Sequence, residues 1–301
     1  MIKTKNHFQK KRMKDLIFCV LVLAIPVTQF IIFYLVVNFN SIIMAFQRYE
    51  SGKFVFNGLN NFQLMWKEVA DGSTLDAIKN SIIVYFCSSL FGLTLSLVFS
   101  FYIYKKMPLS KTFRVFLYLP SILSSMVTVT VFKQLVEIGV KDLFSLQDGL
   151  LSNPDTKMAT LIFFQLLMGF GTQILMYSGA MNGIDDSAIE AARLDGVNTF
   201  QEFFYITIPL IYPTIVTFLV VGMAGVFTNQ LNLYAFYGNG GNLGREYWTV
   251  GFMLFQRVNT AKTMAEYPLL ATYGMTLTLI AAPLTLLFRK GLEKFGPSLD
   301  S

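Results

Sequence analysis

The sequence contains little charge and almost no histidine. Only 14% of its 301 residues are charged and 54% are hydrophobic, whereas an ordinary soluble domain has roughly 25% charged residues. The single histidine, His7, lies in a basic N-terminal tail. That excludes a histidine-based metal site and any Ser–His or Cys–His catalytic pair. The two cysteines, Cys19 and Cys87, lie in apolar runs and form neither a disulfide framework nor a metal cluster. This composition indicates a membrane protein.

Nucleotide-binding and nucleic-acid-binding signals are also missing. No Gly-x-x-x-x-Gly-Lys-Ser/Thr sequence is present, so the chain cannot hold nucleotide phosphates by the P-loop route. The net charge is +6, which is compatible with binding nucleic acid. However, many of the charges lie at the ends of hydrophobic runs, so we expect no nucleic-acid partner.

Six apolar runs are present, and a helix needs about 20 such residues to cross a bilayer. They are Leu16–Val37, Ile82–Tyr104, Val115–Val131, Thr160–Met181, Leu210–Thr228 and Pro268–Phe288. None contains Asp, Glu, Lys, Arg or His. The first run follows a basic stretch, as in a signal peptide. It is longer than a signal peptide's apolar region and no small-x-small cleavage site follows it, so we expect an uncleaved anchor.

The lysines and arginines predict the orientation, because cytoplasmic loops carry an excess of them. They cluster within Lys3–Lys14, Lys105–Arg114 and Arg289–Lys294. Both termini and the loop after the fourth run are therefore predicted to be cytoplasmic. The expected organisation is a basic tail (1–15), a first span with an outer loop (16–81), a five-span core (82–289) containing the loop 182–209, and a tail (290–301).

That loop contains the acidic stretch "IEAARLDG", Ile189–Gly196. Ser187 with Glu190, and Thr199 with Glu202, have the spacing of capping boxes at helix starts. Gly196 lies between them, where a helix would end in a left-handed turn.

Pro209 and Pro213 predict a break or kink where the second helix joins the next span. The residues thus predict helix, glycine turn, helix and membrane span. A plain connector and a helix that docks on a partner would carry the same signals.

A longer motif that includes this stretch resembles the motif of a known family. Glu190-Ala191-Ala192, Gly196 and Ile206-Thr207-Ile208-Pro209 resemble the EAA loop of binding-protein-dependent ABC importer permeases, with Ile208 in place of the usual leucine. Four further segments resemble the sugar-permease branch of the maltose and glycerol-phosphate type. They are "FNGLNNF" (56–62), "KNSIIVYF" (79–86), "FRVFLYLPSILS" (113–124) and "YGNGGN" (237–242), the last without the family's proline.

The resemblance implies an all-α protein of the bacterial cell membrane with six transmembrane helices, the type I ABC importer permease fold and a cytoplasmic coupling helix. It implies that the coupling helix docks on a separate ATPase subunit through Glu190, Ala191, Ala192, Asp195 and Gly196. ATP and magnesium then belong to that subunit, and this chain is neither an enzyme nor a carrier of a cofactor. The expected partners are a second EAA-type permease, two ATPase subunits and an extracellular substrate-binding protein.

Polar residues in two spans form the candidate substrate pathway. Gln165, Gly169, Thr172 and Gln173 recur at helical spacing on one face. Asn229 and Gln230 follow the fifth span. Uncharged amides and hydroxyls suit sugar hydroxyl groups, and in the resembling family these stretches line the pathway. The same residue types also hold helices together, so that alternative stays open.

The predicted function is the permease subunit of an ATP-driven importer for a sugar or oligosaccharide. The alternatives are a stand-alone sodium-coupled secondary transporter and a membrane enzyme. Proton coupling is disfavoured because no span contains a carboxylate or histidine. The outer loops Asn57–Phe62 and Gly238–Gly244 are the candidate docking face for the binding protein.

Overall fold

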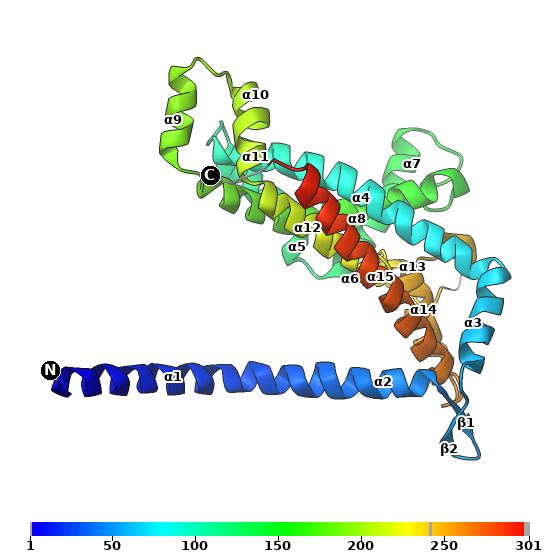
Figure 1. Cartoon of the computed structure of the whole chain (residues 1–301). Coiled ribbons are helices and arrows are strands. Elements are labelled where there is room, and N and C mark those ends of the chain that lie inside the picture. Colours follow the sequence, from blue (N-terminus) through cyan, green and yellow to red (C-terminus); the bar gives the residue numbers. More distant parts are fainter. Residues whose placement is uncertain (1, 241–242, 298–301) are drawn as a thin grey trace. The chain divides into compact units, whose positions relative to one another are not determined.

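The computed structural model describes residues 2–240 and 243–297, and almost all of its regular elements are helices (Figure 1). The chain forms two compact units. The first unit comprises Met1–Lys67 and Ala261–Thr276, and the second comprises Glu68–Thr260 and Leu277–Ser301. Residues 1, 241–242 and 298–301 lie outside the described residues. They belong to the two predicted tails and to the predicted loop Gly238–Gly244.

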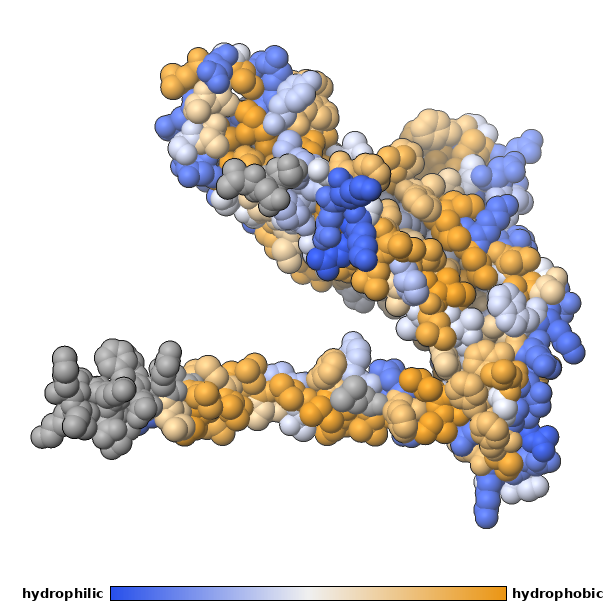
Figure 2. Space-filling view, in the orientation of Figure 1, coloured by the Kyte–Doolittle hydropathy of each residue, from blue (hydrophilic) through white to orange (hydrophobic). Residues whose placement is uncertain are grey.

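The first unit begins with a long apolar helical run and a small hairpin. Its elements are α1 (Ile2–Phe30), a π-helix (Ile31–Val36), α2 (Val37–Ala45), β1 (Gln47–Glu50), β2 (Lys53–Phe56) and the start of α3 (Asn60–Ala70). The predicted first span lies within a continuous apolar helix, Leu16–Ala45. Its side chains are almost entirely exposed, as expected for a helix in contact with lipid (Figure 2).

The segment "FNGLNNF" joins this hairpin to the helices on either side of it. Ser51 and Gly52 both have positive φ, at 50° and 85°, which is the geometry of a tight two-residue hairpin turn. The Asn61 amide then donates to the carbonyl oxygens of Ala45, at 2.8 Å, and Gln47, at 2.7 Å. Asn61 therefore fixes the end of α2 and the start of β1. The sequence analysis did not predict the hairpin.

The second unit holds the remaining helices. They are α4 (Ser73–Tyr104), α5 (Ser110–Ile122), α6 (Ser125–Gln134), a π-helix (Leu135–Gly139), α7 (Val140–Leu143), α8 (Pro154–Asn182), α9 (Asp186–Leu194), α10 (Thr199–Glu202), a π-helix (Phe203–Thr207), α11 (Ile208–Leu210), α12 (Tyr212–Ala224), α13 (Leu233–Tyr237), a 3-10 turn (Arg245–Tyr247) and α14 (Val250–Thr260). The last helix, α15 (Tyr267–Phe295), begins in the first unit and ends in the second.

Helices α4 and α8 form the centre of the second unit (Figure 1). One buried cluster joins them near the start of α4 and includes Val84, Phe164 and Phe252. Another joins them near its end and includes Phe101 and Tyr177. Much of the outward surface of the long helices is apolar (Figure 2), which is the arrangement that a bilayer requires.

The segment "KNSIIVYF" also has a structural role. The Asn80 amide donates to the carbonyl oxygens of Glu246, at 2.6 Å, and Trp248, at 3.0 Å. The Ser81 hydroxyl accepts from the Val250 backbone NH at 2.9 Å. The start of α4 therefore holds the connection that leads into α14.

Four of the six predicted spans are continuous helices and two are broken. The third coincides with Ser110–Ile122 and Ser125–Leu143, which meet at 106°. The fifth lies mostly in Tyr212–Ala224, which meets Thr199–Leu210 at 65°. The sequence analysis did not predict the first break. The break or kink predicted from Pro209 and Pro213 is confirmed at Ile211. The fifth also ends at Ala224 rather than Thr228. The helical fold with up to six spans is confirmed.

Candidate functional site

The acidic loop folds as two short helices joined by a turn, as predicted, but its helix caps differ. The cap of α9 is Asp185, whose side chain accepts from the Ser187 backbone NH at 3.0 Å. The cap of α10 is Asn198, which forms a reciprocal capping box with Gln201. The predicted pairs, Ser187 with Glu190 and Thr199 with Glu202, are therefore wrong. Each true cap precedes the predicted one and already satisfies the free amide.

Gly196 ends α9 in the left-handed turn that the sequence predicts. Its φ is +78°. The Gly196 NH donates to the Arg193 carbonyl and the Val197 NH to the Ala192 carbonyl, both at 3.1 Å. This is the Schellman pattern, which satisfies two of the last free carbonyls of a helix. The turn is thus hydrogen-bonded on both sides of the glycine.

The predicted docking residues differ in exposure. Glu190, Ala191, Asp195 and Gly196 are exposed, while Ala192 is buried against the rest of the unit. Hydrogen bonds from Ser187 hold the pKa of the Asp185 carboxyl below its usual value, so this cap stays charged at neutral pH and complements the helix N-terminus.

Three large apolar side chains of the loop segment are strongly exposed. Leu194, the last residue of α9, is 90% exposed, Phe200 in α10 71% and Tyr205 in the following π-helix 77%. They are available for contact with lipid or with another chain.

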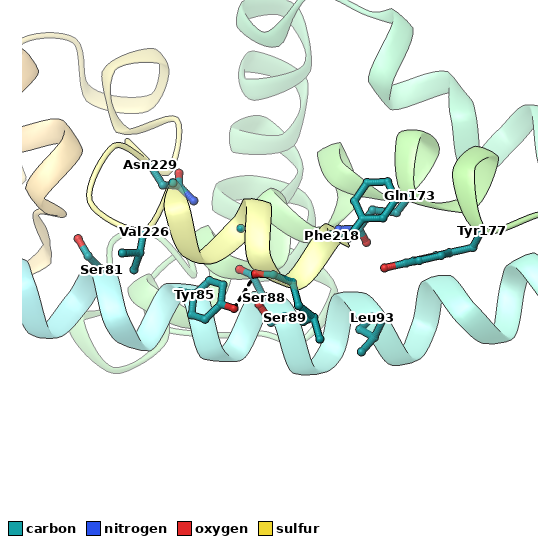
Figure 3. A pocket seen from close by; sticks show the side chains of 13 residues that line it. Ser81, Tyr85, Ser88, Ser89, Leu93, Gln173, Tyr177, Phe218, Val226 and Asn229 are labelled. Atoms are coloured by element: carbon teal, nitrogen blue, oxygen red, sulfur yellow. Dashed lines mark hydrogen bonds between the residues drawn. The ribbon is translucent and has the colours of Figure 1, made fainter. Parts of the chain in front are cut away.

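A cavity of about 150 Å³ lies between α4, α8 and the end of α12 (Figure 3). Its lining residues are uncharged: Ser81, Tyr85, Ser88, Ser89, Leu93, Gln173, Tyr177, Phe218, Leu219, Gly222, Gly225, Val226 and Asn229. Hydroxyls, amides and aromatic rings therefore surround one small space.

Several polar groups that line the cavity have no hydrogen-bond partner among the described residues. The Gln173 oxygen accepts from the Ser96 hydroxyl at 2.8 Å, and the Asn229 oxygen accepts from the Leu231 NH at 2.8 Å. Among the described residues, neither amide NH₂ has a partner, and the buried Ser88 hydroxyl has none either. Tyr85 differs, because its hydroxyl donates to the Leu219 carbonyl at 2.9 Å. Free donors thus face a space that a polar ligand could fill.

Two of the six predicted pathway residues, Gln173 and Asn229, line this cavity. Gln165 does not line it, and its side-chain oxygen accepts from the Asn232 amide at 2.9 Å, which links α8 to the segment before α13. Gly169, Thr172 and Gln230 also lie outside the lining, and Thr172 is exposed.

Sequence reasoning missed the contribution of α4. Ser81, Tyr85, Ser88 and Ser89 all line the cavity, and their spacing of four, seven and eight residues places them on one helical face. The same periodicity revealed the polar face of the fourth span, so the signal was present. In the described part of the chain, no group of three or more His, Cys, Asp or Glu side chains is placed to hold a metal ion.

The long apolar helices define a helical membrane protein, and comparisons with known proteins specify its class. The family model "Binding-protein-dependent transport system inner membrane component" matches residues 88–292. The chain belongs to this family. It is therefore a multi-pass membrane permease subunit of a binding-protein-dependent ABC importer, in which ATP belongs to the ATPase subunit, and is not itself an enzyme. The alternatives of a secondary transporter and a membrane enzyme are excluded.

Curated relatives are similar at low identity. The multiple sugar-binding transport system permease MsmF of Streptococcus mutans is 22% identical over 228 residues, covering 73% of this chain and 78% of the relative. The arabinooligosaccharides transport system permease AraP of Bacillus subtilis is 24% identical over 229 residues, covering 72% of each. The maltose/maltodextrin permease MalF of Escherichia coli is 28% identical over 124 residues, covering 39% of this chain and 24% of the relative.

Solved structures support the fold. A chain of a bacterial ABC transporter that imports the acidic polysaccharide alginate superposes with a TM-score of 0.75 at 18% identity, covering 96% of this chain and 99% of that chain. The MetNI methionine ABC transporter gives a TM-score of 0.53 at 14% identity, covering 76% and 98%. The expected ABC importer permease fold is confirmed.

Proposed function

We propose that this permease subunit carries a sugar or oligosaccharide across the membrane. The observation that carries the proposal is the uncharged cavity, in which the amide NH₂ groups of Gln173 and Asn229 and the Ser88 hydroxyl have no protein partner among the described residues. Such groups match sugar hydroxyls, and the rings of Tyr85, Tyr177 and Phe218 provide apolar surfaces for sugar faces. The sugar transport named for MsmF and AraP agrees with this chemistry.

The cavity is one wall of a larger pathway. Its volume of about 150 Å³ is below the roughly 300–1,000 Å³ of typical small-molecule pockets. A second EAA-type permease subunit completes the pathway in this proposal. Exposed Thr172 and the predicted positions Gly169 and Gln230 then belong to the stretches along which substrate passes, whereas Gln165 holds α8 to the segment before α13.

The α9–α10 loop is proposed to dock on the ATPase. Glu190 and Asp195 supply exposed acidic groups, Ala191 keeps the exposed face narrow, and Gly196 allows the reversal. Buried Ala192 acts as an internal spacer, and the apolar Leu194 adds a large exposed contact. Two ATPase subunits, one for each permease, bind magnesium and ATP.

The remaining assignments follow the distribution of charge. Both termini and the α9–α10 loop are proposed to face the cytoplasm, with a five-span core at 82–289. The opposite face receives an external substrate-binding protein at Asn57–Phe62 and Gly238–Gly244, of which residues 241–242 lie outside the described part of the chain. A binding protein is present in a solved alginate transporter complex.

Matched glutamine variants on α8 test the substrate assignment. Gln173→Ala and Gln165→Ala each remove one internal hydrogen bond to another side chain, but only Gln173 lines the cavity. In the reconstituted complex with its binding protein, uptake of labelled neutral oligosaccharides should show a KM raised roughly 2- to 10-fold in Gln173→Ala, because a neutral hydrogen bond contributes about 0.5–1.5 kcal/mol.

Asn229→Ala should behave like Gln173→Ala, while Gln165→Ala should keep the wild-type KM. Methionine uptake serves as the non-sugar control. Equal KM values in all three variants, or transport of methionine in preference to every oligosaccharide, would contradict the proposal.

A further inference from the structure

A buried ion pair joins the α9–α10 loop to the end of α4. The Lys105 ammonium donates to both carboxylate oxygens of Glu202, each at 2.8 Å. The Lys105 side chain is 16% exposed and that of Glu202 is 6% exposed. Lys105 caps the C-terminus of α4, and Glu202 is the last residue of α10. The pair therefore connects the last turns of two elements that lie far apart in the sequence.

An ion pair in this position is better evidence for orientation than for stability. Removing two charges from water costs several kcal/mol, and an apolar pair of similar volume is often as stable. The advantage of the charged pair is a fixed geometry between two elements. The rings of Phe101 and Phe203 pack beside it at an interplanar angle of 49°, with centroids 4.8 Å apart, so the end of α10 lies against α4 at one defined point.

The two routes away from the loop differ in stiffness. Helix α4 runs without a break from Ser73 to Tyr104, and five of its residues line the cavity. The covalent route into α12 passes a π-helix, the three-residue α11 and a break at Ile211, with a bend of 65°. A continuous helix transmits displacement along its axis, whereas a broken one absorbs part of it.

We propose that Lys105 and Glu202 are the positioning pair that transmits movement of the α9–α10 loop to α4. A displacement of the loop then shifts α4 against α8 and α12 and changes the cavity that α4 lines. The break at Ile211 lets α12 keep its place while the loop moves. This inference rests on the proposed docking of α9 on the ATPase.

Spin labels on α4 and α12 report the movement without any knowledge of the substrate. Phe86 and Val221 are exposed positions on the two helices, and labels there are measured in the reconstituted full complex before and after trapping with ADP and vanadate. The wild type is expected to show a change in the distance between the labels. Lys105→Met with Glu202→Leu keeps the packing but removes the attraction between charges. It should hydrolyse ATP while losing at least half of that distance change.

Two controls separate a positioning role from general damage. Lys105→Glu with Glu202→Lys exchanges the charges and should restore the distance change. Glu293→Gln breaks the exposed pair of Arg289 and Glu293 on α15 and should leave the change intact. A wild-type distance change in the Lys105→Met, Glu202→Leu variant would overturn the proposal.

Failure of this inference is distinguishable from failure of the docking proposal. If α9 does not dock on the ATPase, Glu190→Lys and Gly196→Pro will keep the wild-type distance change and coupled ATP hydrolysis. If docking holds and the ion pair carries no movement, those two variants will be defective while the Lys105 and Glu202 variants remain normal.

Discussion

Gly196 carries the most specific backbone requirement in the α9–α10 loop. Its φ of +78° lies where a side chain costs about 1–2 kcal/mol, and a Cβ added there would meet no neighbouring atom. The cost of substitution is therefore conformational alone. We expect Gly196→Ala to speed amide hydrogen exchange across residues 186–197 in the purified protein, and Gly196→Asn to do so less, because asparagine tolerates this conformation better.

Gly179→Ala is the matched control for that experiment. Gly179 lies inside α8, has no close neighbour at the position of a Cβ and does not have a positive φ. Alanine favours a helix over glycine by about 1 kcal/mol, so exchange in α8 should slow or stay unchanged. Equal exchange in Gly196→Ala and the wild type would show that the turn is not held in the left-handed conformation in solution.

Residue-level signals predicted the turn but not its caps. Glycine is the residue that adopts positive φ without a penalty, so Gly196 had one natural interpretation. Asp185, Asp186 and Ser187 are all good cap residues, as are Asn198 and Thr199. The sequence therefore offered several equivalent starts for each helix. The structure uses Asp185 and Asn198.

At the scale of whole helices, the packing of α5 on α8 depends on one glycine. A Cβ at Gly171 would lie 2.5 Å from the Ser121 hydroxyl oxygen and 2.8 Å from a Tyr118 ring carbon. The tyrosine ring cannot easily move away, so Gly171→Ala should destabilise the protein by about 1–3 kcal/mol through overpacking. A lower unfolding temperature in detergent would show the effect.

Gly169→Ala provides the comparison on the same helix. Nothing lies within 4 Å of a Cβ at Gly169, so this change should leave the unfolding temperature equal or higher. The pair thus separates loss of close packing from a general effect of replacing glycine in α8. The close-packing argument fails if both variants unfold at the same temperature.

At the scale of helices, the hydropathy of the sequence predicted where the spans lie but not where they bend. Apolar run length predicted six crossings, and the helices allow up to six. The 106° bend between α5 and α6 and the 65° bend at Ile211 involve no gap in hydropathy, so run length could not reveal them. Pro209 and Pro213 predicted a break at the second bend, and Pro120 lies near the first, but a proline alone does not determine an angle. The polar face of α4 was readable and was missed, whereas the link between Gln165 and Asn232 depends on tertiary packing.

For the molecule as a whole, the cavity and the loop lie at different points along α4. The cavity lies along its middle, from Ser81 to Leu93, and Lys105 meets the loop at its C-terminal end. A permease that moves solute between two compartments needs such a separation between the pathway and the site of the driving force. A single copy nevertheless supplies only a small, partly polar wall, and this is why a second permease subunit is part of the proposal.

The orientation of the protein in the membrane can be tested with single cysteines in intact cells. With Cys19 and Cys87 replaced by serine, Leu194→Cys and Leu143→Cys place a thiol on two strongly exposed positions, at 90% and 77%. The basic clusters predict that Leu194 faces the cytoplasm and Leu143 the outside. A membrane-impermeant maleimide should therefore label Leu143→Cys in intact cells and Leu194→Cys only after the membrane is opened. The reverse pattern would invert the proposed orientation, and with it the assignment of the α9–α10 loop to an ATPase that works in the cytoplasm.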